Sequence, residues 1–367
     1  MSNQLVNVLV IITTEFVHYG GLTTSVMNIY KAIDKSNLHF DFASTNDLID
    51  AELTGELAKN GSNYYFLGDR KRHVFRYISN LNALLKMNTY DVIHVNSNSS
   101  TAAVELYIAW KNSVSKRIVH NHSSKCNHRI LHTVLLPLYR RLYTQAVACS
   151  REAGDWIFKD STYTVVNNCI DVEKYRFSYE NRTVIRSELG IKEDTVVLGH
   201  LGKIYKPKNH DFIVRVFKEY HEKNPNSLLM LVGDGVLRNE VTKKVYDLGI
   251  GETVLFIGMK RETWKYLSAM DIFVFPSLWE GMPLSLLEAQ ASGLNCFISD
   301  RIDNGVILTD GIEMLSLDTD IEIWVRKILK CDVCDRVNKS KTYSIQIKNK
   351  GYDSSCSARM LRDLYVE

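Results

Sequence analysis

Short apolar runs alternate with amphipathic stretches in the first half of the chain. The first run, Val6–Ile12, is rich in β-branched residues and predicts a buried parallel strand. From 22 to 33, apolar residues recur at positions 22, 26, 29, 30 and 33, which is helical spacing. The same alternation predicts strands at 39–43, 64–67, 91–95, 117–120, 146–149 and 163–166, with helices at 53–58 and 75–86.

The alternation returns in the second half, after a break in the apolar rhythm near 167–181. It predicts strands at 196–201, 228–232, 254–257, 272–276 and 296–299, with helices at 211–223, 238–248, 264–269 and 284–292. Alternating strands and helices indicate βαβ units and a mostly parallel sheet. We therefore expect an α/β chain of two Rossmann-like, doubly wound domains, 1–170 and 171–350, facing each other across a cleft. The segment 351–367 should form a last helix that packs back on the first domain.

Composition limits the class of protein. The 367 residues include 45 Lys and Arg against 42 Asp and Glu, a net charge of +3, and 45% of residues are hydrophobic. These values exclude a mostly disordered chain, and they give no reason to expect a nucleic acid partner. The seven cysteines are odd in number and scattered, which favours a reducing cytoplasm over a disulfide framework. No run approaches the roughly 18 apolar residues of a membrane span, and the polar start lacks the basic residues of a signal peptide.

The clearest chemical motif is FPSLWEGMPLSLLEAQASG, from Phe275 to Gly293. Pro283 suits the first helical position, since proline lacks the N–H that would be unpaired there. The helix start then offers free N–H groups and a positive dipole end to a phosphate. Glu280 and Glu288 flank this anion site and fit a phosphorylated sugar ligand, one carboxylate facing sugar hydroxyls and the other a ribose diol. A capped helix with two surface glutamates would show the same spacing.

A second motif, GHLGKIYKPKNH at 199–210, runs from a strand into a loop with three lysines. Cations at the carboxyl end of a strand can neutralise a diphosphate leaving group as its charge develops. A solvated basic loop is the alternative reading of these residues.

Together these motifs resemble the retaining, nucleotide-sugar-dependent glycosyltransferases of the GT-B fold, which carry an E-x7-E motif. The resemblance implies that Glu280 contacts the donor sugar and that Glu288 binds the nucleotide ribose. Family members usually place Gly-Arg where this chain has Gly202-Lys203, and Lys208 matches a family lysine. Lys203 keeps the charge but loses the bidentate fork of arginine, so Lys208 is the stronger candidate. The resemblance also implies donor contacts for the residues at the helix start and after the strand at 254–258, which are Gly281, Met282, Pro283, Leu284 and Met259.

The N-terminal half adds Gly20 and Gly21 after the first strand. Glycine permits close backbone approach and positive φ, although an ordinary turn would also use it. In the family this loop approaches the donor phosphates and the acceptor. The run GGLTTSVMNIYKAID at 20–34, with FDF at 40–42, resembles bacterial capsular and exopolysaccharide members.

Two histidines, His120 and His122, follow the strand at 117–120. The family places a histidine here that contacts the donor sugar. Either residue fits, and we favour His122, which lies further into the loop; a polar loop histidine without this role is the alternative. No cysteine or carboxylate cluster joins them, so we expect no metal site and no metal cofactor.

The stretch 125–143 mixes Lys125, Arg129, Arg140 and Arg141 with many apolar residues. A basic, apolar helix can lie on an anionic membrane surface, which would suit a lipid-linked acceptor. An ordinary core-facing helix with basic ends is the alternative, and it fits the sequence better.

The sequence therefore predicts a retaining hexosyltransferase-type enzyme of bacterial cell-surface polysaccharide synthesis. It would move a sugar from a nucleotide diphosphate donor to a glycan or lipid-linked saccharide. The resemblance to the family favours UDP as the nucleotide. We expect it to be cytoplasmic, with peripheral contact to the inner face of the membrane through 125–143. The alternative is a non-catalytic, glycosyltransferase-like subunit that binds a glycan or a partner. Within enzymes, a nucleotide-sugar epimerase or glycogen-type synthase of the same fold comes next.

Overall fold

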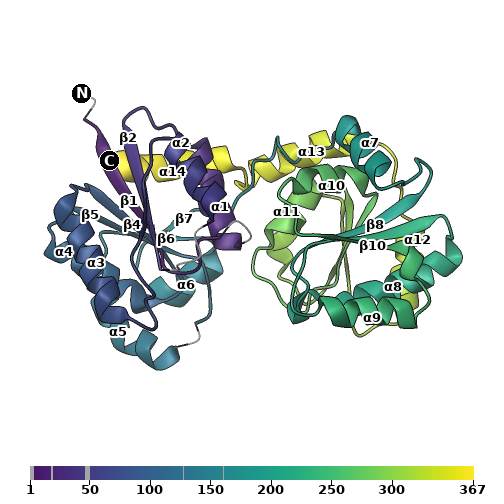
Figure 1. Ribbon diagram of the computed structural model, residues 1–367, viewed down its shortest axis with the longest axis horizontal. Coiled ribbons are helices and arrows are strands. Elements are labelled where there is room, and N and C mark those ends of the chain that lie inside the picture. The colour runs from purple at the N-terminus through teal and green to yellow at the C-terminus, as the bar shows by residue number, and fades with distance from the viewer. Residues whose placement is uncertain (1–3, 18–19, 46–49, 127, 160) are drawn as a thin grey trace. The chain divides into compact units, whose positions relative to one another are not determined.

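The computed structural model describes residues 4–17, 20–45, 50–126, 128–159 and 161–367. Asn127, within the basic apolar stretch 125–143, lies outside them. The chain divides into two compact units, shown in Figure 1. Unit 1 combines Met1–Cys169 with Ser354–Glu367, and unit 2 is Ile170–Asp353.

Unit 1 is built on a seven-stranded sheet with the order β3-β2-β1-β4-β5-β6-β7. All its strand pairs are parallel, and β1, inside the sheet, pairs with β2 on one side and with the central strand β4 on the other. The strands are β1 (Val6–Ile12), β2 (Leu38–Ser44), β3 (Tyr64–Phe66), β4 (Val92–Ser97), β5 (Lys116–Asn121), β6 (Gln145–Ala148) and β7 (Thr164–Val165).

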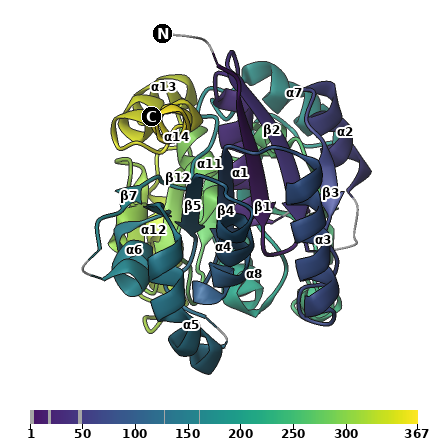
Figure 2. The ribbon, with the colours of Figure 1, turned by 90° about the vertical axis from the view of Figure 1, so that its left-hand side faces the viewer.

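Helices cover both faces of this sheet, because alternate residues of each strand point to opposite sides. Leu9 and Ile11 of β1 face the helices that follow β3, β4, β5 and β6, and Figure 2 shows α3 and α4 in front of the strands. Val8 and Val10 face α1, α2 and α14. The helices are α1 (Gly21–Ala32), α2 (Ala51–Lys59), α3 (Val74–Met87), α4 (Ala103–Lys111), α5 (Arg129–Leu142), α6 (Arg151–Phe158) and α14 (Ser354–Val366).

Unit 2 repeats the plan with a six-stranded parallel sheet of order β10-β9-β8-β11-β12-β13. Its strands are β8 (Val196–Leu201), β9 (Ser227–Val232), β10 (Val254–Gly258), β11 (Ile272–Phe275), β12 (Asn295–Ser299) and β13 (Ile312–Leu315). Its helices are α7 (Tyr179–Glu188), α8 (His210–Lys223), α9 (Arg238–Asp247), α10 (Thr263–Ala269), α11 (Leu284–Ala291), α12 (Ile321–Leu329) and α13 (Arg336–Asn349). The expected α/β fold of two Rossmann-like domains is confirmed.

The last helix, α14, belongs to unit 1, although it follows unit 2 in the sequence. In Figure 1 it is the yellow helix among the purple and blue elements. Ala358, Leu361 and Tyr365 are buried in the same apolar cluster as α1. Among the described residues, no helix has the length and apolar content needed to cross a membrane.

Several elements were absent from the prediction. The largest is α13, where the sequence shows only a polar stretch. This helix packs on α11 through small residues: Ser340 Oγ donates to the carbonyl of Ala291 at 2.7 Å. A Cβ at Gly293 would lie 2.7 Å from the Ser340 nitrogen, so the backbones are in close contact there. Such a helix needs no wide apolar stripe, and hydrophobic periodicity therefore misses it.

Candidate functional site

The carboxyl ends of β8 and β11 carry the two motifs of unit 2, and the fold brings them together. A short 3-10 turn, η2 (Lys206–Lys208), follows β8. Leu278 N donates to the carbonyl of Pro207 at 2.8 Å, and Asn209 Nδ2 donates to the carbonyl of Pro276 at 3.2 Å. These bonds fasten the lysine loop to the loop that holds Glu280.

Lys208 and Glu280 meet at this junction. Lys208 Nζ lies 2.8 Å from Glu280 Oε1, and the side chains are only 9% and 13% exposed. The ammonium also stands 4.3 Å from the centre of the Phe275 ring. Burial lowers the pKa of Lys208, and the charge of Glu280 acts against that shift. Lys203, in contrast, is exposed.

Two glycines make room for this arrangement. A Cβ at Gly202 would lie 3.1 Å from Lys208 Cε, so glycine leaves the space that the lysine hydrocarbon fills. Gly233 has φ of 137°, and a Cβ there would lie 2.0 Å from the Gly202 oxygen. The backbone at Gly202, after β8, and the backbone at Gly233, after β9, can therefore come into contact next to Lys208.

Buried polar atoms around Lys208 remain without partners among the described residues. They are His200 Nε2, both ring nitrogens of His210, and Ser277 Oγ. The rings of His200 and His210 cross with their centres 4.8 Å apart. Burial, with the nearby charge of Lys208, lowers the pKa of His210 to about 4, which leaves its ring neutral. Because buried polar groups are normally hydrogen-bonded, these atoms indicate a site that a polar ligand or water completes.

These three residues were not predicted as site residues. His200 lies inside a strand and His210 at the start of a helix. In the sequence alone, nothing distinguishes these two histidines from ordinary core or surface residues. The sequence signal that could have found them is the polar residue type at strand and helix ends of one sheet edge.

Glu288 lies further along, in α11, and is also buried. Burial raises its pKa to about 7, while Tyr175, Lys174 and Thr263 act against that shift. The Tyr175 hydroxyl lies 3.3 Å from Thr263 Oγ1, and the ammonium of Lys174 stands 3.9 Å from the centre of the Trp264 ring. The second glutamate of the motif thus has its own polar neighbours, which differ from those of the Lys208–Glu280 pair.

The loop between the two glutamates leads into α11. Pro283 is the N-cap of this helix and not its first residue, with φ of −76° and ψ of 109°. Gly281 is exposed, and Met282 and Leu284 are half-buried. The first N–H groups of a helix lack partners within it, so this end can still receive an anion. Met259 directly follows β10 and is half-buried.

The glycine pair of unit 1 does not need positive φ. Gly20 is the N-cap of α1 with φ of −90°, and Gly21 is the first helical residue. A Cβ at Gly21 would meet nothing within 4 Å. Positive φ as a reason for these glycines is therefore wrong. Close approach to a ligand stays a prediction.

His120 and His122 lie on one face of β5 and its following loop. Their rings stack with centres 4.0 Å apart, and His94 of β4 stacks on His120 at 5.5 Å. His120 is 2% exposed, whereas His122 is half-buried. Burial lowers the pKa of His122 to about 4, so its ring is neutral at pH 7. Within the described part of the chain, no group of three or more His, Cys, Asp or Glu side chains is arranged to hold a metal ion.

Comparisons with known proteins find similarity to glycosyltransferases. The family model described as "Glycosyl transferases group 1" matches residues 181–331, and the model described as "Glycosyltransferase Family 4" matches residues 19–174. EpsF of Bacillus subtilis, whose name describes a glycosyltransferase, is 29% identical over 362 residues, which are 94% of this chain and 93% of EpsF. The UDP-Gal:alpha-D-GlcNAc-diphosphoundecaprenol alpha-1,3-galactosyltransferase of Escherichia coli is 26% identical over 306 residues, 77% of either chain.

Among solved structures, HepE of Anabaena in complex with UDP aligns with a TM-score of 0.76 at 15% identity. The alignment covers 97% of this chain and 98% of HepE. At this identity the likeness establishes the fold alone. The two family matches follow one another along the chain, as the two sheets do. The two relatives align over 94% and 77% of the chain and are also glycosyltransferases by name. The chain therefore has the GT-B fold, is similar to group 1 glycosyltransferases over 181–331 and to family 4 glycosyltransferases over 19–174, and has relatives among proteins of bacterial polysaccharide biosynthesis.

Proposed function

We propose that the protein is a retaining glycosyltransferase that moves a hexose from a nucleoside diphosphate, UDP first among them, to a hydroxyl of a glycan or lipid-linked saccharide. The buried Lys208–Glu280 pair is the observation that carries this proposal. It places a cation for a diphosphate beside a carboxylate for sugar hydroxyls, at the sheet edge where ligands of such folds bind. The two relatives whose names or titles mention UDP or UDP-Gal support the choice of base.

In this proposal unit 2 binds the donor. Glu288 takes the ribose diol, and the start of α11 with Lys208 and Lys203 takes the diphosphate. Gly281, Met282, Pro283 and Leu284 border the phosphates, and Met259 borders the base. Charge on the leaving diphosphate is then stabilised by fixed groups, and no metal cofactor is required. Unit 1 supplies His122 or His120 to the donor sugar, with Gly20 and Gly21 near the phosphates and the acceptor.

The reaction breaks the bond between the anomeric carbon and the diphosphate oxygen and forms a bond from that carbon to the acceptor oxygen. The acceptor attacks the face that the diphosphate leaves, which keeps the anomeric configuration. The proton of the acceptor hydroxyl passes to the departing phosphate oxygen. The products are the glycoside, the nucleoside diphosphate and, at neutral pH, the released proton.

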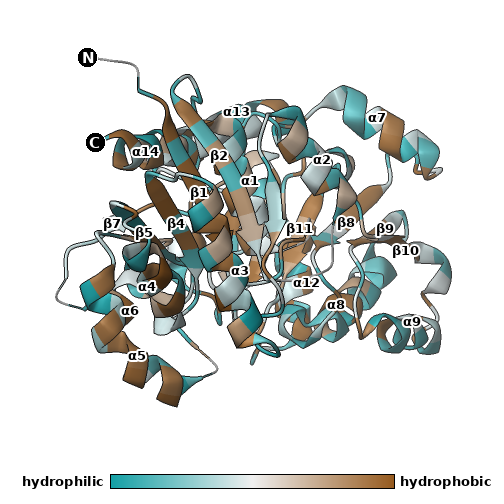
Figure 3. Ribbon diagram, turned by 60° about the vertical axis from the view of Figure 1, so that its left-hand side comes forward, coloured by the Kyte–Doolittle hydropathy of each residue, from teal (hydrophilic) through white to brown (hydrophobic). Residues whose placement is uncertain are grey.

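The helix α5 supports peripheral contact with an anionic membrane, such as the inner face of the cell membrane. Its apolar side chains at positions 130, 134 and 138 form one stripe, and Ile130 and Val134 are 84% and 67% exposed. Another face of α5 packs on the core through Leu135, Leu136, Tyr139 and Leu142, as the core-facing reading expected, so the exposed stripe is an additional feature of this helix. Arg129 and Arg141 are exposed at its two ends, and the ribbon of α5 in Figure 3 carries brown segments, which mark apolar residues. An amphipathic helix with basic flanks suits an anionic lipid surface, where a lipid-linked acceptor would lie.

Nucleotide binding tests the proposal first. Thermal unfolding is measured with UDP, GDP, ADP and CMP, and a ligand at 100 times its Kd should stabilise the protein by about 2.7 kcal/mol. We expect UDP to raise the midpoint, and Glu288→Ala to abolish the rise. Glu262→Ala, an exposed glutamate of the same unit, is the matched control.

Transfer is tested next, with UDP-hexoses and lipid-linked or free saccharides. We expect a product with the donor's anomeric configuration, and its loss in Glu280→Ala. A wild-type protein that binds no nucleotide and transfers no sugar would favour the non-catalytic subunit. An inverted product would rule out retention, and a changed sugar nucleotide without acceptor would favour an epimerase.

A further inference from the structure

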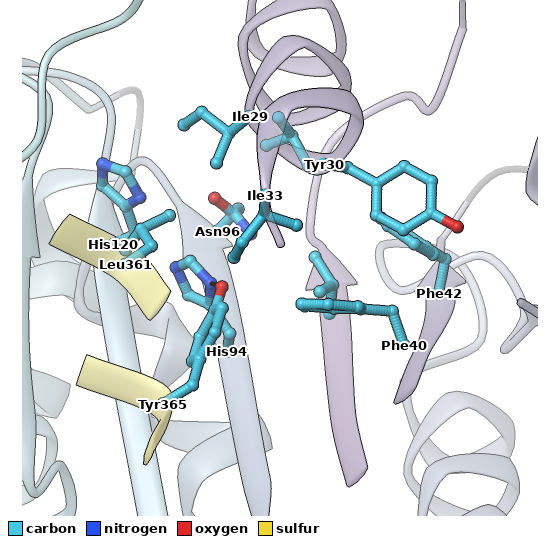
Figure 4. A pocket seen from close by; sticks show the side chains of 12 residues that line it. Ile29, Tyr30, Ile33, Phe40, Phe42, His94, Asn96, His120, Leu361 and Tyr365 are labelled. Carbon is cyan, nitrogen blue, oxygen red and sulfur yellow. Dashed lines mark hydrogen bonds between the residues drawn. The ribbon is translucent and has the colours of Figure 1, made fainter. Parts of the chain in front are cut away.

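A cavity lies inside unit 1, between the central strands and the helices α1 and α14 (Figure 4). Figure 4 shows His94, Asn96 and His120 grouped on one side of it, with Phe40, Phe42 and Tyr30 on the other. About 20 Å³ is open to the centre of a water-sized sphere. One water molecule needs roughly 10–15 Å³ by this measure, so the space suffices for a water.

The hydroxyl of Tyr365, from α14, reaches the polar side of the cavity. It lies 2.6 Å from His94 Nδ1. Burial raises the pKa of Tyr365 and lowers the pKa of His94 to about 3, so both groups are neutral at pH 7. A phenol has one proton to give and a neutral imidazole has one acceptor nitrogen. When Tyr365 donates to Nδ1, the proton of His94 sits on Nε2.

That Nε2 has no partner among the described residues, and neither do Asn96 Nδ2 and both ring nitrogens of His120. The backbone of Val166 influences the His120 ring but does not reach hydrogen-bonding geometry with it. Unpaired polar atoms in a protein interior are costly. They border a space of the right size, and an ordered water there can accept from His94 Nε2 and donate to the acceptor nitrogen of His120.

The side chain of Asn96 connects this cavity to His122. Its Oδ1 lies 2.9 Å from His122 Nε2, and Asn168 Oδ1 lies 3.2 Å from His122 Nδ1. A neutral ring carries one proton and can donate to only one of these oxygens. A half-turn of the Asn96 amide exchanges its oxygen and nitrogen without changing its shape. Nδ2 then donates to His122 Nε2, and Oδ1 accepts from the water.

We propose that Tyr365 is a positioning residue for His122, acting through His94, one buried water and Asn96. Each link of this chain, from the Tyr365 hydroxyl to Asn168 Oδ1, pairs one donor with one acceptor. It fixes the His122 proton on Nδ1 and sets the orientation of the ring. The C-terminal helix α14 is thereby part of the histidine site. The effect on transfer rests on the proposed function, in which His122 contacts the donor.

The test is the protonation state of the ring nitrogens in the ¹⁵N-labelled full-length protein, measured by NMR without donor. The wild type should show the Nε2–H form of His94 and the Nδ1–H form of His122. Tyr365→Phe should move the ring resonances of both histidines and lower kcat about tenfold at unchanged donor KM.

Tyr30→Phe is the matched control. Tyr30 lines the same cavity, but its hydroxyl pairs with Ser62 Oγ at 2.7 Å and not with the histidines. This variant should leave the ring resonances and kcat unchanged. If Tyr365→Phe fails to fold, His94→Phe is the second variant. It keeps an aromatic ring in the stack but removes both ring nitrogens. It should move the His122 resonances as Tyr365→Phe does.

Unchanged His122 resonances in a folded Tyr365→Phe or His94→Phe protein would overturn the proposal, and so would a wild-type Nδ1–H form of His94. An equal loss of kcat in Tyr30→Phe would also overturn it, since the effect would then be structural. If the wild type transfers no sugar, the proposed function fails by itself. The ring resonances then still decide whether the hydrogen-bond chain exists.

Discussion

Lys208 and Glu280 neutralise each other in a buried ion pair, with 2.8 Å between Nζ and Oε1. In the proposed function each has a ligand group as its target, the diphosphate for Lys208 and the sugar for Glu280. A diphosphate would therefore replace Glu280 as the counterion of Lys208. A buried charge without a partner is costly, so the pair keeps the lysine charged and in place before the donor arrives.

Replacing Lys208 should weaken UDP binding. Lys208→Met removes a charge-assisted contact to the diphosphate, and we expect a Kd about 10 to 100 times higher. Isothermal titration calorimetry measures the change. Lys206→Met is the matched control, because this lysine lies in the same turn but is exposed. Its Kd should stay within about twofold of the wild type.

A double variant separates binding from folding. Lys208→Met alone leaves Glu280 buried without its counterion, which lowers stability. Lys208→Met/Glu280→Gln removes both charges, so it should recover thermal stability without recovering UDP affinity. Recovery of both would mean that Lys208 supports the loop and does not contact the diphosphate.

Glu288 should make stability depend on pH. Its pKa in the folded protein is about 7, against an ordinary value of 4.5, and burial is the main cause. The folded state therefore binds this proton more tightly than the unfolded state, and the free energy of unfolding falls as the pH rises from about 4.5 to about 7. The full loss at pH 8 is on the order of 3 kcal/mol.

Glu288→Gln removes this ionisation while keeping the shape of the side chain. Denaturant unfolding at pH 4 and pH 8 should show a variant that is close to the wild type at pH 4 and more stable at pH 8. Glu262→Gln, at an exposed position, should follow the wild type at both values. A Glu288→Gln curve parallel to that of the wild type would show that Glu288 stays ionised when buried.

The central strands were predictable because their apolar runs are long and β-branched. β1 was predicted over its full length, Val6–Ile12, since both of its faces are buried. The helix α6 was missed although Ser150 caps it, with Oγ accepting from Ala153 N at 3.1 Å. A single capping serine before about two turns of mixed residues is a weak signal beside a strong strand pattern. α13 was missed because serines, not a wide apolar stripe, line its contact with α11.

From the sequence, candidate site residues could be grouped only where they lie close together along the chain, as Glu280, Gly281 and Glu288 do. The ion pair of Glu280 with Lys208 joins positions 72 residues apart, and only the strand order of the sheet brings them together. The stack of His94 on His120 depends in the same way on the pairing of β4 with β5. Spacing along one strand cannot reveal a neighbour on the next. The resemblance to a family named both partners of the ion pair without their contact, and it named His120 but not His94.

Asp271 should be a main determinant of the stability of unit 2. Its Oδ2 accepts from Arg186 Nη2 at 2.6 Å and from the backbone N–H of Val197 at 2.7 Å, and its Oδ1 lies 2.9 Å from Arg182 Nη1. Asp271→Asn removes the shared counterion of these arginines. We expect a loss of about 3–5 kcal/mol in the free energy of unfolding.

Urea unfolding followed by circular dichroism measures this loss. Glu222→Gln is the control, because it breaks an exposed pair with Lys218 on α8, which is worth under about 0.5 kcal/mol. A loss in Asp271→Asn as small as in the control would mean that backbone groups alone satisfy the arginines. The carbonyls of Ala269 and Thr195 already accept from Arg186.

The exposed stripe of α5 should bind anionic membranes. Ile130→Glu/Val134→Glu places two carboxylates where apolar side chains would enter the lipid interface. We expect at least a tenfold loss of binding to vesicles that contain anionic phospholipid, measured by co-sedimentation, because both burial and charge attraction are lost. Raising the salt concentration should weaken wild-type binding, since exposed charges are screened.

Val236→Glu is the matched control for this surface. Val236 is 90% exposed in unit 2, so the variant gains a charge at an equally accessible apolar position away from α5. It should bind vesicles as the wild type does. If both variants lose binding equally, the effect follows net charge and not the α5 stripe. If neither does, the stripe faces another partner, and a lipid-linked acceptor would have to reach the enzyme by a different surface.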